Sequence, residues 1–236
     1  MPKSNCFQYA TGYGGFCMAL AFYYHPFSSY CWKALIPLYE AGTAFTPRRV
    51  DDPEAGAELK RRWPIARFPV LVDEASGLTL PEASVIIEYL DTHYPGARPM
   101  LPADPQLRLE VRLLDRFFDN YIHGSLQKIT GDRLRAADKR DAHGVAEAHT
   151  MLDKCYAWLD ERMQGKEWAV GNDFSLADCA AAPALFYSDW VHPIGDAHPN
   201  VAAYRARLLA RPSVKRAIDA ARPFRAFFPG GAPDRD

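Results

Sequence analysis

Residues 24–33, which read YHPFSSYCWK, bring together side chains of the kinds that enzymes use for chemistry. Ser28 and Cys31 lie three residues apart, and His25 precedes the serine by three. A serine hydroxyl can act as a nucleophile or as a hydrogen-bond donor, and a cysteine reacts as its thiolate. A serine–histidine nucleophile needs a third, orienting group, and no aspartate lies nearby in the sequence. We therefore do not expect a hydrolytic serine–histidine site.

The pattern around this segment predicts that it joins a strand to a helix. The apolar run at 18–24 predicts a buried strand, and apolar residues at helical spacing from Ser29 predict a helix that Gly42 ends. Pro37 lies inside that helix, where it removes one hydrogen bond and clashes with the preceding turn, so we expect a kink or an early end. Ser28 would stand at the start of the helix, where serine commonly caps the free N–H groups.

The following segments predict the rest of a small α/β domain. The segment 44–50 favours an edge strand, because its proline is tolerated only at the edge of a sheet. A short helix follows, then a hairpin at 69–73 and 78–80, and then a helix at 82–93. The predicted order of elements is therefore β-α-β-α-β-β-α.

The segment 95–105 holds four prolines and no periodicity, which is typical of a linker. Beyond it almost every segment has helical periodicity, so we predict an α/β domain followed by an all-α domain. The expected boundaries are 1–17 for an extension or tag that is not ordered, 18–94 for the α/β domain, 95–105 for the linker, 106–225 for the helical domain and 226–236 for a C-terminal tail. Helices are expected at 106–131, 143–164, 175–187, 200–210 and 213–221.

Composition excludes several classes of partner and site. The chain has 236 residues, 48% of them hydrophobic, and a net charge of −1, so neither nucleic acid nor a membrane is expected as a partner. The five cysteines are odd in number and scattered, without a CxxC pair. A disulfide framework and a metal site are therefore not expected, and reduced thiols favour a cytoplasmic location.

The order of elements and four local motifs resemble those of the cytosolic glutathione transferases, over nearly the whole chain. That family joins a thioredoxin-like α/β domain to an all-α helical domain. The first motif is HPFSSYCWK, in which Ser28 occupies the position of the serine found in the serine-type bacterial branch, with its theta-like and zeta-like members. The resemblance implies that Ser28 donates a hydrogen bond to the thiolate of glutathione, beside the positive end of a helix. A helix cap without chemistry is the alternative.

The second motif is FPVL, at residues 68–71. In the family, the proline that opens this strand follows a cis peptide bond, and the residue before it pairs with the cysteinyl backbone of glutathione. The resemblance assigns these positions to Pro69 and Phe68 and places Arg67 near the glycyl carboxylate. An ordinary trans proline and a solvated surface arginine are the alternatives.

The third motif, LPEASVIIEYLD, departs from the family pattern. There an acid and then a serine hold the γ-glutamyl end of glutathione at a helix N-terminus, which is a natural anion site. Glu82 matches the acid, but Ala83 stands in the place of the serine, and Ser84 comes one residue late. Backbone N–H groups of Ala83 and Ser84, or the Ser84 hydroxyl, would have to compensate, or glutathione binding is weaker. A first-turn acid favoured by the helix dipole is the alternative role of Glu82.

The fourth motif, FSLADCAAAPAL, predicts a structural feature only. Ser175 and Asp178 have the spacing of a capping box at the start of a core helix. The aromatic residues of the chain are candidates for an apolar pocket. In the family that the chain resembles, such a pocket in the helical domain receives the second substrate, an electrophile. We assign this pocket to Phe27, Tyr121, Tyr187 and Trp190, with a role in the core or at an interface as the alternative.

The resemblance implies a glutathione transferase that conjugates the thiolate of glutathione, its co-substrate, to a small apolar electrophile. Glutathione-dependent isomerisation or reduction at the same site is a second possibility. A third is a non-catalytic binding module, as in proteins that resemble stringent starvation protein, and Ala83 favours it. Family members are usually homodimers without a metal.

Cys31 falls on the trailing position of the thioredoxin C-x-x-C pair, and we expect a buried thiol that takes no part in chemistry.

Overall fold

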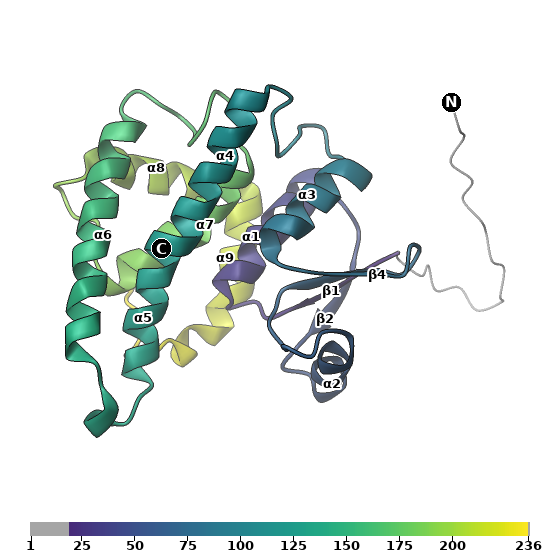
Figure 1. Cartoon of the computed structure of the whole chain (residues 1–236), viewed down its shortest axis with the longest axis horizontal. Coiled ribbons are helices and arrows are strands. Elements are labelled where there is room, and N and C mark those ends of the chain that lie inside the picture. The colour runs from purple at the N-terminus through teal and green to yellow at the C-terminus, as the bar shows by residue number, and fades with distance from the viewer. Residues whose placement is uncertain (1–18, 236) are drawn as a thin grey trace.

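The computed structural model describes residues 19–235. An N-terminal α/β domain packs against a larger domain made of helices (Figure 1). This arrangement confirms the predicted fold class. The extension predicted for residues 1–17 lies outside the described residues.

A four-stranded sheet forms the centre of the N-terminal domain, in the order β2-β1-β3-β4. β1 runs parallel to β2 and antiparallel to β3, and β3 runs antiparallel to β4. β2 lies at the edge of the sheet, where Pro47 costs no ladder hydrogen bond. The strands are β1 (Leu20–Tyr24), β2 (Thr46–Arg49), β3 (Val70–Asp73) and β4 (Leu78–Pro81).

Helices cover both faces of this sheet (Figure 1): α1 (Ser29–Ala41) and α3 (Ala83–His93) lie on the face toward the helical domain, and α2 (Pro53–Arg62) lies on the other. The alternation of side chains along β1 explains this arrangement. Leu20 and Phe22 pack against α1 and α3, whereas Ala21 and Tyr23 pack with the α2 residue Leu59.

The helix after the YHPFSSYCWK segment does not end early, although the sequence contains a proline at position 37. α1 continues through Pro37 to Ala41, and Gly42 ends it with a φ of +65°. The early end was therefore a wrong expectation. Nine of the thirteen residues of α1 are buried, including every residue from Cys31 to Leu38, so tertiary packing outweighs the lost hydrogen bond.

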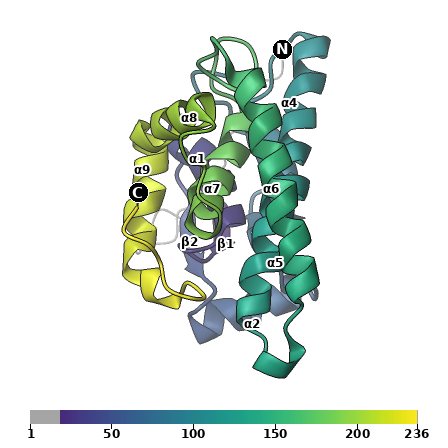
Figure 2. The same cartoon turned by 90° about the vertical axis from the view of Figure 1, so that its left-hand side faces the viewer.

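The helical domain surrounds a central helix, α7, all of whose sixteen residues are buried (Figure 2). The helix predicted for 106–131 is interrupted by a π-helical segment, η1, which periodicity does not reveal because its wider turn shifts the pattern by only one residue. The elements are α4 (Pro105–Phe117), η1 (Phe118–His123), α5 (Gly124–Arg133), η2 (Ala137–Lys139), α6 (Ala142–Met163), α7 (Leu176–Val191), α8 (Pro199–Ala210), α9 (Pro212–Ala221) and η3 (Arg222–Phe227).

The predicted capping box begins α7. The Ser175 N–H donates to Asp178 Oδ2 at 2.9 Å, and the buried Asp178 carboxylate also accepts from the Tyr204 hydroxyl at 2.6 Å. This confirms the prediction of a structural motif.

No helix among residues 19–235 is both long and apolar enough to cross a bilayer.

Candidate functional site

A cavity of about 810 Å³ lies between the two domains, and six of the predicted site residues line it. They come from three separate segments: the β1–α1 loop, the loop before β3, and the start of α3. These six residues are Ser28, Arg67, Phe68, Pro69, Glu82 and Ala83. The fold therefore brings together residues that lie more than fifty positions apart in the sequence.

Ser28 is both a helix cap and a residue of the cavity wall. Its Oγ accepts a hydrogen bond from the Cys31 N–H at 3.4 Å, and this caps α1. The cap uses one acceptor lone pair and leaves the single O–H donor of the hydroxyl free. That donor has no acceptor among residues 19–235, so Ser28 can cap the helix and still donate into the cavity.

The His25 and Cys31 side chains near Ser28 do not line the cavity. His25 Nδ1 accepts from the Phe27 N–H at 3.1 Å, and burial lowers the pKa of His25. The Cys31 side chain is 0% exposed, and burial raises the pKa of its thiol to about 12. Cys31 is therefore a buried thiol, as predicted.

The loop before β3 presents Phe68 to the cavity. The Phe68–Pro69 peptide bond is cis, which confirms the prediction from the FPVL motif. Within the described part of the chain, no other residue forms a hydrogen bond with the Phe68 backbone, so its N–H and C=O can bind a ligand. Arg67 is exposed beside it, and no described residue forms an ion pair with it.

The start of α3 is uncapped where it meets the cavity. Glu82 precedes the helix with a φ of +71°, and its side chain makes no capping hydrogen bond. A non-glycine residue with this backbone conformation is strained by about 1–3 kcal/mol, and such residues cluster at ligand sites. The first N–H groups of α3, including that of Ala83, therefore lack a capping side chain and face a cavity that could receive an anion.

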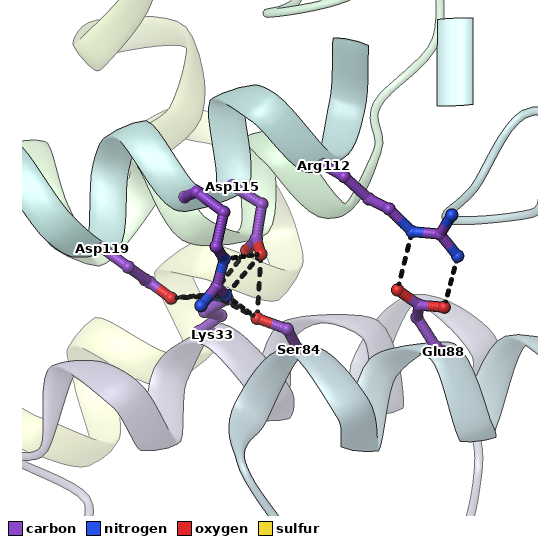
Figure 3. Close-up of polar contacts among 7 residues, drawn as sticks. Lys33, Ser84, Glu88, Arg112, Asp115 and Asp119 are labelled. Carbon is purple, nitrogen blue, oxygen red and sulfur yellow. Dashed lines mark hydrogen bonds and ion pairs between the residues drawn. The ribbon is translucent and has the colours of Figure 1, made fainter. Parts of the chain in front are cut away.

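The Ser84 side chain does not line this cavity, contrary to the suggestion that its hydroxyl replaces the serine missing at position 83. Its Oγ donates to Asp115 Oδ2 and accepts from Lys33 Nζ, both at 2.9 Å (Figure 3). Successive residues of an α-helix point about 100° apart, so a shift of one position turns the hydroxyl toward the helical domain. Only the backbone N–H of Ser84 remains at the helix N-terminus.

Lys33 is the centre of a buried ion-pair cluster between the domains (Figure 3). Its side chain is 1% exposed, and Nζ lies 2.5 Å from Asp115 Oδ1 and 2.6 Å from Asp119 Oδ2. Arg116 contacts the same two carboxylates, so two positive and two negative charges balance. A buried ion of this kind persists because it is paired and hydrogen-bonded.

The cluster was missed in the sequence, although Lys33 is part of the HPFSSYCWK motif. Its carboxylate partners lie on α4 and η1, and Asp119 is 86 residues away in the chain. No local spacing signals such a contact. Beside the cluster, Arg112 and Glu88 form a bidentate pair at 2.6 and 3.0 Å, which also joins α4 to α3 (Figure 3).

The four aromatic residues assigned to the electrophile pocket do not line the cavity. Phe27, Tyr187 and Trp190 form a cluster with Phe228, whose ring lies 4.9 Å from that of Trp190. The C-terminal segment covers this cluster, since the Trp190 Nε1–H donates to the Arg235 carbonyl at 2.9 Å. The fourth, Tyr121, is 50% exposed on another side of η1.

Polar residues of the helical domain line the cavity instead. Arg116, Asp119, Asn120 and Gln127 face it from α4, η1 and α5, together with Tyr30 from the first turn of α1. Sequence reasoning did not identify these residues. The π-helical turn decides which face of the 106–131 segment meets the cavity, and the sequence pattern does not show that turn.

Among residues 19–235 there is no group of three or more His, Cys, Asp and Glu side chains that could hold a metal ion.

Two family models match the chain, one over each domain. Their descriptions are "Glutathione S-transferase, N-terminal domain" for residues 22–98 and "Glutathione S-transferase, C-terminal domain" for residues 111–212. The chain is 30% identical over 202 residues to a stringent starvation protein A homolog of Coxiella burnetii, which covers 84% of this chain and 91% of that protein. It is 28% identical over 212 residues to a probable maleylacetoacetate isomerase of Vibrio cholerae, with 85% and 95% covered.

Solved structures include a close match in fold. The crystal structure of a glutathione S-transferase from Methylobacterium radiotolerans, in complex with glutathione sulfonate, superimposes with a TM-score of 0.73 at 26% sequence identity. The match covers 92% of this chain and 98% of that one, so both domains share one arrangement.

Proposed function

Because the chain belongs to the glutathione S-transferase family, we propose that it binds glutathione in this cavity and transfers the glutathione thiolate to an electrophilic small molecule. Ser28 would be the catalytic residue, as in the serine-type branch. The observation that carries this proposal is the free O–H donor of Ser28 on the wall of a cavity that also contains the uncapped N-terminus of α3.

The proposed role of Ser28 is to lower the pKa of a bound thiol. A free thiol has a pKa of about 8.5, and only the thiolate is a good nucleophile. A hydroxyl that donates to the sulfur favours the ionised form, and so does the partial positive charge at the start of α1. Ser28 would not itself attack the electrophile. The sulfur would attack carbon and form the C–S bond, and the electron pair of the broken bond would leave with the displaced group.

The remaining predicted residues would hold the tripeptide. The backbone of Phe68, which precedes the cis peptide bond to Pro69, would pair with the cysteinyl residue. Arg67 would face the glycyl carboxylate. At the other end, Glu82 would bind the α-ammonium of the γ-glutamyl residue, and the N–H groups of Ala83 and Ser84 would bind its carboxylate.

We also propose that the protein is a homodimer in the cytoplasm. Four large apolar side chains on α3, α4 and η1 are between 49% and 62% exposed: Val85, Leu109, Leu113 and Tyr121. Exposed apolar side chains that gather on neighbouring helices are typical of a surface that another protein covers. The three cysteines within residues 19–235 are all free and buried, which supports a reducing compartment.

Replacement of Ser28 by Ala tests the catalytic proposal. A hydrogen bond to a charged group contributes about 1.5–3 kcal/mol, so we expect kcat to fall roughly 10- to 100-fold while the Kd of glutathione changes little. Loss of the helix cap costs about 1 kcal/mol of stability as well. Asp104→Ala is the matched control, since it removes the cap of α4, where Asp104 accepts from the Leu107 N–H at 2.8 Å, away from the cavity. Unchanged turnover in Ser28→Ala would contradict the proposal, and so would a lack of glutathione binding in calorimetry at millimolar concentration.

A non-catalytic binding module is a second candidate function. The 30% identity to a stringent starvation protein A homolog favours it, as does the absence of a hydroxyl at Ala83. Co-purification with polymerase or ribosomal components, without glutathione turnover, would support the module.

Glutathione-dependent isomerisation or reduction would use the same thiolate, and the similarity to a probable maleylacetoacetate isomerase favours isomerisation. A substrate screen separates these reactions from conjugation.

A further inference from the structure

A second cavity, of about 630 Å³, lies beneath the C-terminal segment of the chain. It shares no lining residue with the cavity that contains Ser28. Its wall combines the end of α5, the loop before α6, the end of α7 and the segment after η3. The described residues of this wall are Arg133, Arg140, Trp190, Gly230, Gly231, Ala232 and Pro233.

The only charged side chains among these described wall residues are two arginines. Arg133 is half-buried, and its Nη1 donates to the Pro229 carbonyl at 3.0 Å. Arg140 is exposed, and no residue between 19 and 235 forms an ion pair with either guanidinium. Charges that are partly removed from water are normally paired in proteins, and this wall offers no carboxylate to pair with Arg133.

Two glycines bring the C-terminal segment close to Arg133. Gly230 and Gly231 have φ angles of +85° and +87°, which residues with a Cβ rarely adopt. A Cβ at Gly230 would lie 3.1 Å from Nη1 and 3.2 Å from Cδ of Arg133. A side chain at position 230 would therefore displace the arginine, so the glycine keeps the guanidinium at the cavity wall.

A third guanidinium adds positive charge beside the cavity. The Arg225 guanidinium carbon lies 5.0 Å from the centroid of the Trp190 ring, and Nη2 donates to the Pro233 carbonyl. Trp190 and Pro233 both line the cavity. The acids that adjoin wall residues in the sequence, Asp132 and Asp189, form ion pairs with other arginines. The cavity is therefore electropositive.

We propose that this cavity binds a phosphate group, carried by a small phosphorylated compound or present as the free ion, between the guanidinium groups of Arg133 and Arg140. A guanidinium has five N–H donors in a planar fork, which matches two phosphate oxygens at once. Small-molecule sites have volumes of about 300–1,000 Å³, so the cavity also has room for an organic group attached to the phosphate. The inference does not rest on the proposed function, because the two cavities share no residue.

Calorimetry with glycerol 3-phosphate, inorganic phosphate and glycerol tests the site. We expect saturable binding of at least one of the two phosphates, and no binding of glycerol, at concentrations up to about 10 mM. Loss of one charge-assisted contact should raise the Kd at least about 10-fold in Arg133→Gln and in Arg140→Gln. Gly230→Ala should also weaken binding, because the new Cβ displaces Arg133. A lower Kd for glycerol 3-phosphate indicates a phosphorylated compound as the ligand, and a lower Kd for inorganic phosphate indicates the free ion.

The matched control is Arg135→Gln, since Arg135 lies two positions from Arg133, outside the cavity, and pairs with Asp132 at 3.6 Å. A screened charge outside the site contributes little, so this Kd should stay within about two-fold of wild type. Arg140 is exposed, so Arg140→Gln keeps the test decisive if Arg133→Gln does not fold. The inference is overturned if the wild type binds neither phosphate, if glycerol binds as well as its phosphate, or if Arg135→Gln weakens binding as much as Arg140→Gln.

Discussion

His123 makes the stability of this protein depend on pH in a direction that the structure specifies. Its side chain is 1% exposed, and neither ring nitrogen has a hydrogen-bond partner among residues 19–235. Burial, and secondarily the positive charge of Lys33, lowers the pKa of His123 to about 3. The imidazole is therefore neutral in the folded protein at any pH above about 4, whereas in the unfolded chain it titrates near 6.5.

The sign of the effect follows from proton binding. Between pH 6.5 and pH 3 the unfolded chain binds a proton that the folded protein does not, so the free energy of unfolding decreases as the pH falls. For a group with these two pKa values, the free energy of unfolding decreases by about 2 kcal/mol between pH 7 and pH 5. Burial also lowers the pKa of His25 and of His149, and these shifts add to the loss with the same sign.

Urea unfolding of the wild type and of His123→Phe at pH 7 and pH 5 measures the contribution of this one residue. Phe keeps an aromatic ring against Tyr30 and cannot titrate, so the wild type should lose about 2 kcal/mol more than the variant between the two pH values. His143→Gln is the control, because the His143 side chain is 88% exposed and its replacement should leave the pH dependence unchanged. Equal pH dependence in the wild type and His123→Phe would refute the reasoning.

Three other substitutions test the Lys33 cluster, the proposed glutathione site and the proposed dimer. Lys33→Met leaves the carboxylates of Asp115 and Asp119 buried with one cation fewer, and should reduce the free energy of unfolding in urea by about 3–5 kcal/mol; a loss below about 1 kcal/mol would show that the cluster is not desolvated. Ala83→Ser restores the hydroxyl that the family places beside the γ-glutamyl carboxylate, and calorimetry should give a Kd for glutathione roughly 3- to 10-fold lower, with an unchanged Kd as the contrary result. Leu113→Glu places a charge on a side chain that is 59% exposed on α4, and light scattering should show a monomer, whereas a persistent dimer would place the interface elsewhere.

Local sequence patterns predicted the parts of the site that depend on neighbouring residues. Ser28 caps α1 because a serine just before a helix can accept from the N–H three residues on, as the contact with Cys31 shows. The cis form of Pro69 was implied by the resemblance of the FPVL motif to the family, and the structure contains it. Each of these features is confined to one turn or one loop, so the few residues around it specify it.

Distant contacts decided what the motifs could not. The Ser84 hydroxyl lies in the Lys33 cluster and not at the expected ligand site. It donates there to the carboxylate of Asp115 on α4, 31 residues away in the chain. Phe228 from the C-terminal segment packs against the aromatic residues that were predicted to form a pocket. The cavity is lined by Asn120 and Gln127 instead.

The sequence by itself therefore determined the two-domain fold and the helix caps at Ser28 and Ser175, since hydrophobic periodicity, helix caps and turns act over a few residues. Only the tertiary structure decided which side chains of the helical domain line the same cavity as Ser28. That choice depends on the π-helical turn at Phe118–His123 and on packing between segments far apart in the chain, which no local pattern encodes.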